Sequence, residues 1–151
     1  MLLMRHNSPV FLLSLCNMEF KRGEYLISDD KSLLNVQKVH GLLTETYWAQ
    51  GRSLEDVRSS IRNSLCFGLY IDNIQIGFGR FISDQSVISW FGDFIIEEKY
   101  RAIGLGKWML ECMLSHPEIK NTKVILATKD AHSLYEKYGF EQSEFMLLDL
   151  N

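Results

Sequence analysis

The sequence lacks the features that mark several large classes of protein. It has no run of five or more Lys and Arg, and its net charge is −3, so it offers no basic field for holding nucleic acid. No apolar run approaches the roughly 20 residues that a membrane-spanning helix needs. With only two prolines in 151 residues, no repeat, low-complexity tract or linker divides the chain. We therefore expect neither nucleic acid nor a membrane as a partner.

Cysteine is also scarce, and its placement argues against a structural or metal-binding role. Cys16, Cys66 and Cys112 are odd in number and widely spaced, with no CxxC pattern and no Cys/His ligand spacing. In apolar surroundings such residues usually behave as small buried side chains in a reducing compartment. The sequence therefore predicts a cytoplasmic protein without a metal site.

What the sequence does contain is enough apolar material for one real core. Its apolar fraction is 46%, and the aromatic share is 12%, which argues against disorder. We expect a single domain over residues 18–151. Residues 1–17 are expected to be an N-terminal extension: either an apolar segment packed on the domain, or a leader upstream of a second start at Met18. The run Val10 to Leu15 in this extension is too short to span a bilayer.

Hydrophobic periodicity and turn residues predict ten elements in the order β-α-α-β-β-β-α-β-α-β. Asp72-Asn73 is a good two-residue hairpin loop between two of the strands. A strand–helix–strand unit from Val87 to Ala127 requires a right-handed parallel crossover. The fold class is therefore α/β or α+β with a mixed sheet. The expected strands are 24–28, 65–71, 74–82, 87–96, 123–127 and 143–150, and the expected helices are 33–46, 54–63, 105–115 and 130–138.

The join "EEKYRAIGLGKW", residues 97–108, suits a phosphate ligand. A glycine-rich turn between a strand and a helix lets backbone N–H groups converge, and the helix dipole adds positive potential. Arg101 and Lys107 add cations. A Walker A loop is excluded because Trp108 follows Lys107, and a dinucleotide fingerprint because Met109 stands where a third small residue is needed.

About thirty residues after "RAIGLG" comes "LYEKYGF", and together the two motifs resemble the GCN5-related N-acetyltransferase (GNAT) superfamily, in particular a small bacterial-type single-domain member. That family has an R/QxxGxG/A loop and a later helix written NxxAxxLYEKxGF. The resemblance implies a mixed, mostly antiparallel sheet flanked by helices, with one parallel β-α-β unit carrying the CoA loop. The matching positions are Arg101, Gly104, Gly106, Ala131, Leu134, Tyr135, Glu136, Lys137, Gly139 and Phe140.

The resemblance implies acetyl-CoA as cofactor. It places the N–H of Phe94 toward the thioester carbonyl and Ile96 beside the pantetheine amide. Thr128 stands where the family commonly has Asn, and Ala102-Ile103 where Gly-Lys is frequent, which leaves phosphate binding more dependent on backbone N–H groups. The expected cofactor-binding residues are Phe94, Ile96, Arg101, Ala102, Gly104, Leu105, Gly106, Lys107 and Thr128.

Two residues are the candidates for catalysis. Tyr135 matches the family residue that often protonates the leaving thiolate. The alternative is that its ring only packs in a short amphipathic helix. Asp93 is a carboxylate in an otherwise apolar strand, where burial could make it a general base. The alternatives for Asp93 are a strand bulge satisfied by its neighbours, Glu45 or Glu97 as the base, or a water relay.

The acceptor pocket is expected from the first third of the chain and the central strands. Tyr47, Trp48 and Arg80 are the expected substrate-binding residues. Arg52, just beyond the expected helix end, and Trp90, on a central strand, are further residues of the same kind. Aromatics with a few polar groups suit a small or amino-acid-like amine, although core packing would explain them equally well.

The resemblance therefore implies an acetyl-CoA-dependent N-acetyltransferase, an acyltransferase that moves acetyl directly to a primary amine of a small molecule or peptide. The alternative is a catalytically degenerate GNAT-like module that senses CoA or another small ligand. A homodimer is compatible with the sequence.

Overall fold

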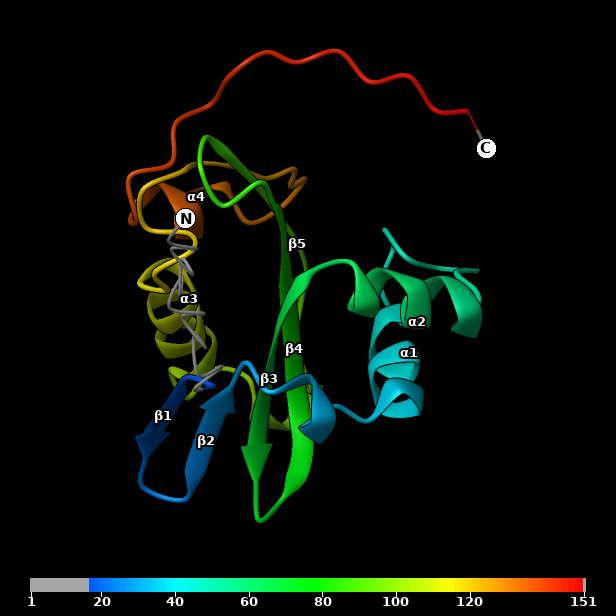
Figure 1. Ribbon diagram of the computed structural model, residues 1–151, viewed down its shortest axis with the longest axis vertical. Helices are drawn as coiled ribbons and strands as arrows, with labels where there is room; N and C mark the ends of the chain where they lie inside the picture. The colour runs from blue at the N-terminus through cyan, green and yellow to red at the C-terminus, as the bar shows by residue number, and fades with distance from the viewer. Residues whose placement is uncertain (1–16, 151) are drawn as a thin grey trace, which may run out of the picture.

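The protein is built on one six-stranded sheet with helices on both faces (Figure 1). The computed structural model describes residues 17–150. The strands lie side by side in chain order, and neighbours are antiparallel except for the parallel pair β5 and β6. This confirms the expected mixed sheet with a single parallel β-α-β unit. The strands are β1 (Glu19–Arg22), β2 (Tyr25–Ser28), β3 (Leu65–Ile71), β4 (Ile74–Ser83), β5 (Ile88–Ile96) and β6 (Lys123–Ile125).

The helices divide between the two faces of the sheet. In Figure 1, α1 and α2 lie on one side of the central strands, and α3 and α4 lie on the other. Each face has its own core: Val39, Leu43 and Val57 of the first pair pack together, and Met109 and Met113 of α3 belong to the second cluster. The helices are α1 (Val36–Thr44), α2 (Leu54–Arg62), α3 (Leu105–Leu114) and α4 (His132–Glu136), with short 3-10 turns at Lys31–Leu33 and Glu98–Tyr100.

Local chemistry explains where these elements begin. Asn35 caps α1 by accepting from the N–H of Lys38 at 2.9 Å, and Ser53 caps α2 by accepting from the N–H of Asp56 at 3.1 Å. The β3–β4 hairpin turns through Asp72 and Asn73, whose φ angles are 49° and 62°. Positive φ at both central residues is what a two-residue hairpin with the twist of the sheet requires, so the predicted hairpin is confirmed.

Helix α1 is fixed over the sheet by two polar contacts. The buried Gln75 of β4 accepts from the N–H of Asn35 at 2.8 Å. Lys38 pairs with Glu97, just beyond the end of β5, at 2.6 Å. These contacts place the loop that follows α1 beside the carboxyl end of β5, where the candidate site forms.

The strand predicted at residues 143–150 is wrong. Residues 140–150 have no regular secondary structure. Residues 140–145 line a cavity beside β6, and the end of the segment extends beyond the domain as a tail (Figure 1). The composition of this segment favours a β-strand, but a strand forms only through hydrogen bonds to a neighbouring strand. None of the described residues pairs with the outer edge of β6. The apolar side chains of the tail are therefore exposed: Phe145, Met146, Leu147, Leu148 and Leu150.

Three smaller boundaries also differ from the prediction. The sequence analysis missed β1, of whose four residues three are charged: Glu19, Lys21 and Arg22. The helix expected from residue 33 begins only at Val36, after Asn35 takes the cap position. The strand expected at 123–127 stops at Ile125, and this early stop matters for the site.

Cys66 and Cys112 are free and buried, as predicted. Burial raises the pKa of each thiol to about 11, which leaves both as inert thiols at neutral pH. Cys16 lies outside the described residues, as does the expected N-terminal extension apart from Asn17. Between residues 17 and 150, no helix combines the length and apolar character needed to cross a membrane.

Candidate active site at the splayed strands

A bulge in β5 shapes the centre of the site. Arg80 of β4 lies opposite Gly92, yet Phe78, two residues away, lies opposite Ile95. Gly79 therefore faces two residues, Asp93 and Phe94, and Asp93 takes a left-handed φ of 53°. Such a bulge bends the strand and re-aims its side chains. The alternative interpretation of Asp93 as a residue at a strand bulge is thus confirmed for its backbone.

Shortly before the bulge, after Trp90, β5 and β6 separate. Their parallel pairing covers only residues 88–90 against 123–125, while β5 continues to Ile96. Since β6 ends at Ile125, residues 126–128 follow a different course from β5. The two strands therefore diverge at their carboxyl ends, where ligands commonly bind in open α/β sheets.

A cavity of about 830 Å³ opens at this divergence. It is lined by the loop between α1 and α2, by the bulged half of β5 and by the segment that leads into α4. All of the expected catalytic and substrate-binding residues line it, together with four of the nine expected cofactor-binding residues. They are Tyr47, Trp48, Arg80, Asp93 and Tyr135, with Phe94, Ile96, Arg101 and Thr128.

The glycine loop lies at the end of β5 and starts α3. Gly104 is the N-cap residue of α3 with a φ of 89°, and no side chain caps this helix. The N–H groups of the first turn, from Leu105 to Lys107, are therefore free of a side-chain acceptor and available to an anion. A Cβ built on Gly106 would find only Ile96 Cγ1 within 4 Å, at 3.9 Å, so the space before the helix is open.

The loop residues differ in what they present to a ligand. Arg101 reaches back along the loop and donates from Nε to the carbonyl oxygen of Ile96 at 2.7 Å. Ala102 has a φ of 64° and is exposed, whereas the side chain of Leu105 is buried in the core. Of this group only Arg101 lines the cavity; Ala102, Gly104, Leu105, Gly106 and Lys107 lie beyond its lining.

Tyr135 extends from α4 into the cavity. It is half-buried and packs edge-on against Phe91 and Phe140, with ring centroids 6.1 and 5.6 Å away. Burial, with the nearby Asp130 and Tyr47, raises the pKa of its phenol above the ordinary value. Its hydroxyl forms no hydrogen bond within residues 17–150, so it stays protonated and free to donate.

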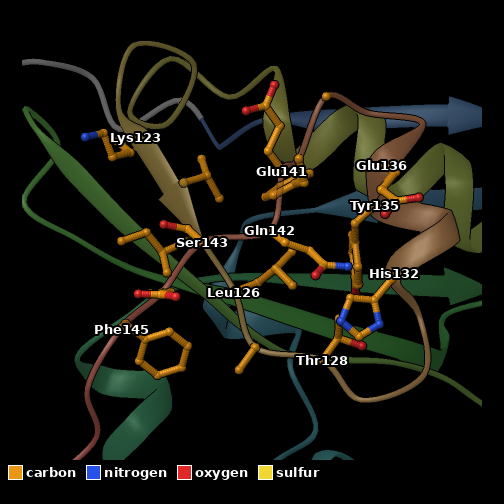
Figure 2. Close-up of a pocket in the computed structure, with 16 residues that line it drawn as sticks. Lys123, Leu126, Thr128, His132, Tyr135, Glu136, Glu141, Gln142, Ser143 and Phe145 are labelled. Carbon is orange, nitrogen blue, oxygen red and sulfur yellow. The ribbon is translucent and has the colours of Figure 1, made fainter.

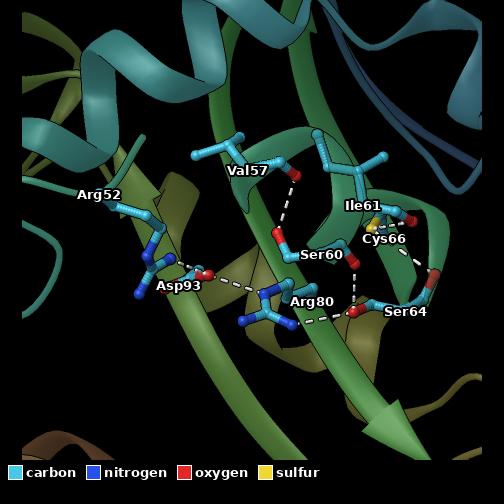
Figure 3. A network of polar contacts seen from close by, with 8 residues as sticks. All are labelled: Arg52, Val57, Ser60, Ile61, Ser64, Cys66, Arg80 and Asp93. Carbon is cyan, nitrogen blue, oxygen red and sulfur yellow. Dashed lines mark hydrogen bonds and ion pairs between the residues drawn. The ribbon is translucent and has the colours of Figure 1, made fainter. Parts of the chain in front are cut away.

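Asp93 is held between two arginines (Figure 3). Its Oδ2 accepts from Arg52 Nη1 at 2.6 Å and from Arg80 Nε at 2.7 Å. Arg80 also donates from Nη1 to the hydroxyl of Ser64 at 2.9 Å. Protonating Asp93 at Oδ2 would cost both ion pairs, so this geometry favours a positioning role for Asp93 over proton abstraction.

The end of the cavity beside the α1–α2 loop is aromatic and carries charge of both signs. The rings of Tyr47 and Trp48 meet edge to face with centroids 5.0 Å apart, and Lys129 Nζ lies 5.0 Å from the centroid of the Tyr47 ring. Lys129 and its neighbour Asp130 line the cavity, and the sequence analysis missed both. Their only signal was their position directly after Thr128.

Thr128 and Tyr135 also border a second cavity, of about 550 Å³ (Figure 2). This cavity lies along the outer side of β6 and under α4, and His132 points into it. The hydroxyl oxygen of Thr128 accepts from the N–H of Ala131 at 3.0 Å, and its proton remains available to a ligand. Thr128 therefore retains a hydrogen-bonding group where the wall between the two cavities is thin.

Comparison with known proteins agrees with this geometry. Residues 62–142, more than half of the chain, match the family model for the acetyltransferase (GNAT) domain. A solved GNAT-family protein from Xanthomonas campestris pv. campestris is 34% identical, with a TM-score of 0.78 over 82% of this chain and 88% of the other. A provisionally named acetyltransferase from Gibberella zeae, FG08082, is 28% identical over 140 residues, covering 77% of this chain and 78% of the relative.

A more distant structure carries a ligand. The GNAT acetyltransferase from Elizabethkingia anophelis, solved with acetyl-CoA bound, is 17% identical, with a TM-score of 0.63 over 82% of this chain and 80% of the other. At that identity the likeness shows the fold alone. Together, the family match and the fold establish that this chain belongs to the GNAT family of acetyltransferases.

Proposed function

We propose that this protein is an acetyl-CoA-dependent N-acetyltransferase that transfers acetyl directly to a primary amine of a small molecule or peptide. The observation that carries the proposal is convergence on one cavity. The free phenol of Tyr135, the bulged backbone at Phe94 and the aromatic pair Tyr47–Trp48 all border it. Thioester, proton donor and amine could therefore meet in a single space.

The residues present suit CoA at the loop. Helix α3 begins without a side-chain cap, the space before Gly106 is open, and Arg101 and Lys107 supply positive charge on either side. An uncapped helix N-terminus with flanking cations is a natural pyrophosphate site. Towards the cavity, Ile96 and Thr128 offer backbone and hydroxyl groups to the pantetheine arm, since the Ile96 carbonyl retains a lone pair beyond its bond to Arg101.

Acetyl-CoA supplies its acetyl group as a thioester, so a C–N bond must form while the C–S bond breaks and the departing sulfur gains a proton. Tyr135 is placed to donate that proton, because its phenol is neutral and lines the cavity. The N–H of Phe94 is the candidate to polarise the carbonyl, since Phe94 lies in the bulge, where it shares Gly79 with Asp93 and the regular pairing with β4 is interrupted.

The incoming amine must lose a proton to a base. Asp93 was the expected base, but its two ion pairs support a positioning role better. Glu97 is engaged by Lys38 at 2.6 Å and does not line the cavity. Glu45 does line it and is exposed. We therefore assign amine deprotonation to Glu45 or to a water molecule that it orders.

Incubating the protein with acetyl-CoA and a panel of primary amines tests the proposal. We expect amine-dependent release of free thiol and an acetylated product by mass spectrometry. Acetyl-CoA at a hundredfold excess over its Kd should also raise the Tm by about 5–10 °C, whereas ATP or NAD should not. Stabilisation without turnover on any amine would indicate a CoA-binding sensor module. No stabilisation by acetyl-CoA would overturn the cofactor assignment.

A further inference from the structure

Asp93 brings together two arginines from separate parts of the chain (Figure 3). Arg52 comes from the loop between α1 and α2, and Arg80 comes from β4. Both donate to the same oxygen, Asp93 Oδ2, at 2.6 and 2.7 Å. All three residues line the cavity in which the proposed transfer takes place. The cluster is therefore part of the site rather than of a distant ion-pair network.

The cluster has two positive charges and only one negative charge. Two guanidinium groups surround a single carboxylate, and the third partner, the hydroxyl of Ser64, is neutral. The exposed fractions of the side chains are 4% for Asp93, 14% for Arg80 and 24% for Arg52, so water hydrates them poorly. Within residues 17–150 no second carboxylate pairs with either arginine. An uncompensated charge in such a place is unfavourable, and an anion from outside the chain would relieve it.

Both arginines retain donors that face no protein acceptor. Among the described residues, Arg52 Nε and Nη2 and Arg80 Nη2 form no hydrogen bond to the chain. A guanidinium group presents its N–H groups in a fixed planar fork, which matches the oxygens of a carboxylate or a phosphate. Each arginine thus retains N–H groups that can donate to an oxyanion.

The backbone at Asp93 maintains this arrangement. Its φ of 53° lies in the left-handed region, which most non-glycine residues avoid and aspartate tolerates better than others. The bulge turns the carboxylate toward the arginines instead of leaving it in the alternation of the strand. Asp93 acts as a positioning residue that fixes both guanidinium groups.

We propose that Arg52 and Arg80, held by Asp93, bind an oxyanion carried by the acceptor amine itself, a carboxylate or a phosphate. This inference rests on the proposed function for the presence of an amine acceptor. The ammonium group of such a substrate has partners as well, because the carboxylates of Glu45 and Asp130 line the same cavity and can face it. The substrate class is therefore a small amine with an anionic group, in preference to an uncharged amine.

Matched acids and amides test the subsite through turnover. β-Alanine is compared with β-alaninamide, phenylalanine with phenylalaninamide, and 2-aminoethyl phosphate is the phosphate arm. We expect kcat/KM to be at least tenfold higher for the acid, which carries the carboxylate, than for the matched amide. Amine basicity cannot produce that preference, because the amine of an amide loses its proton more readily than that of the acid. The better of the carboxylate and phosphate arms identifies the oxyanion.

Arg52→Gln should reduce the preference for the acid, expressed as the ratio of kcat/KM for each acid to that for its amide, by at least tenfold. Arg58→Gln is the matched control, since Arg58 is exposed on α2 and pairs with Glu55 at 3.6 Å. Equal rates for acids and amides, or an acid preference that survives Arg52→Gln, would overturn the subsite while leaving acetyl transfer intact.

Calorimetric binding of the N-acetyl acids and N-acetyl amides provides a readout that needs no turnover. The acids should bind at least tenfold more tightly to the parent protein, and this difference should disappear in Arg52→Gln. If no amine is acetylated but this difference is found, the proposed function fails and the anion subsite stands. Equal affinity for acids and amides in the parent protein would overturn the subsite.

Discussion

Arg101 Nε donates to the carbonyl oxygen of Ile96 at 2.7 Å, which ties the glycine loop to the last residue of β5. The bond folds the arginine back so that it borders the central cavity while the loop continues to the start of α3. One side chain therefore connects the glycine loop with the opening between β5 and β6, the two regions across which we propose that CoA binds.

Arg101→Gln should weaken CoA binding by about 10–100-fold, because it removes a cation and the tether of the loop, and hydrogen bonds to charged groups contribute about 1.5–3 kcal/mol each. Calorimetric titration with CoA measures the effect, with Arg58→Gln as the control for loss of one positive charge. Unchanged affinity in Arg101→Gln would show that Arg101 serves only the loop conformation.

The two glycines of the loop should respond differently to substitution. Gly106 has room for a side chain in the free protein, so Gly106→Val should fold normally and lose CoA affinity because the valine occupies the ligand's space. Gly104 has a φ of 89°, so Gly104→Ala should lower the free energy of unfolding by about 1–2 kcal/mol through backbone strain. Thermal unfolding and CoA titration of both variants separate the effects. Parent-like CoA binding by Gly106→Val would place the pyrophosphate elsewhere.

Tyr135→Phe should reduce turnover by roughly 10²–10⁴-fold and leave CoA affinity nearly unchanged, since the ring still packs against Phe91 and Phe140 and only the proton donor is lost. Solvent can also protonate a thiolate, because the pKa of a thiol is about 8.5, so we expect the loss at the low end of this range. Equal steady-state rates for the two proteins on the same amine would leave Tyr135 with a packing role alone.

The pH dependence of the parent enzyme follows from the direction of the Tyr135 shift. Burial raises the pKa of the phenol above its ordinary value, so the acid form is present throughout the neutral range. Rates should therefore rise from pH 6 to 9 as more of the amine is deprotonated, with no alkaline decline from Tyr135 in that range. A decline below pH 9 that disappears in Tyr135→Phe would contradict this assignment.

The ion pair between Lys38 and Glu97 should make a small contribution to stability that is sensitive to acid. The hydrogen bond from Lys38 is the largest cause that lowers the pKa of Glu97 below 4.5. Because the folded pKa is the lower one, the contribution is present above about pH 4.5 and is lost as the pH falls through the folded value. For a partly exposed pair we expect at most about 1 kcal/mol. Denaturant unfolding of the parent protein and Glu97→Gln at pH 7 and pH 3 should show a difference that shrinks at the lower pH.

Much of the fold was predictable because it depends on local signals. The Asp72-Asn73 turn and the cap at Ser53 are each encoded in a few adjacent residues. The predicted strand at 143–150 failed for the opposite reason. Its composition favours β structure, but a strand forms only where another backbone accepts its hydrogen bonds, and sequence alone does not identify that neighbour.

The site was predictable to a similar degree. The motifs located Arg101, Gly104 and Tyr135, since the loop and the α4 helix are contiguous in sequence. Pattern reasoning could not show that Arg52 and Arg80 would share one oxygen of Asp93, because the three residues lie on different elements and meet only after the sheet has formed. Lys129 and Asp130 were missed because an ordinary charged pair after a strand carries no recognisable pattern.

The sequence by itself determined the family, the glycine loop and the proton-donor candidate, because those features depend on residue types at fixed short spacings. Only the tertiary structure decided which groups Asp93 contacts and how the cavity is charged. The bulge that gives Asp93 a φ of 53° arises from the register between β4 and β5, and the partners of its carboxylate come from residues 41 and 13 positions away. The charge state of a site depends on such long-range neighbours, because electrostatic interactions act through space and not along the chain.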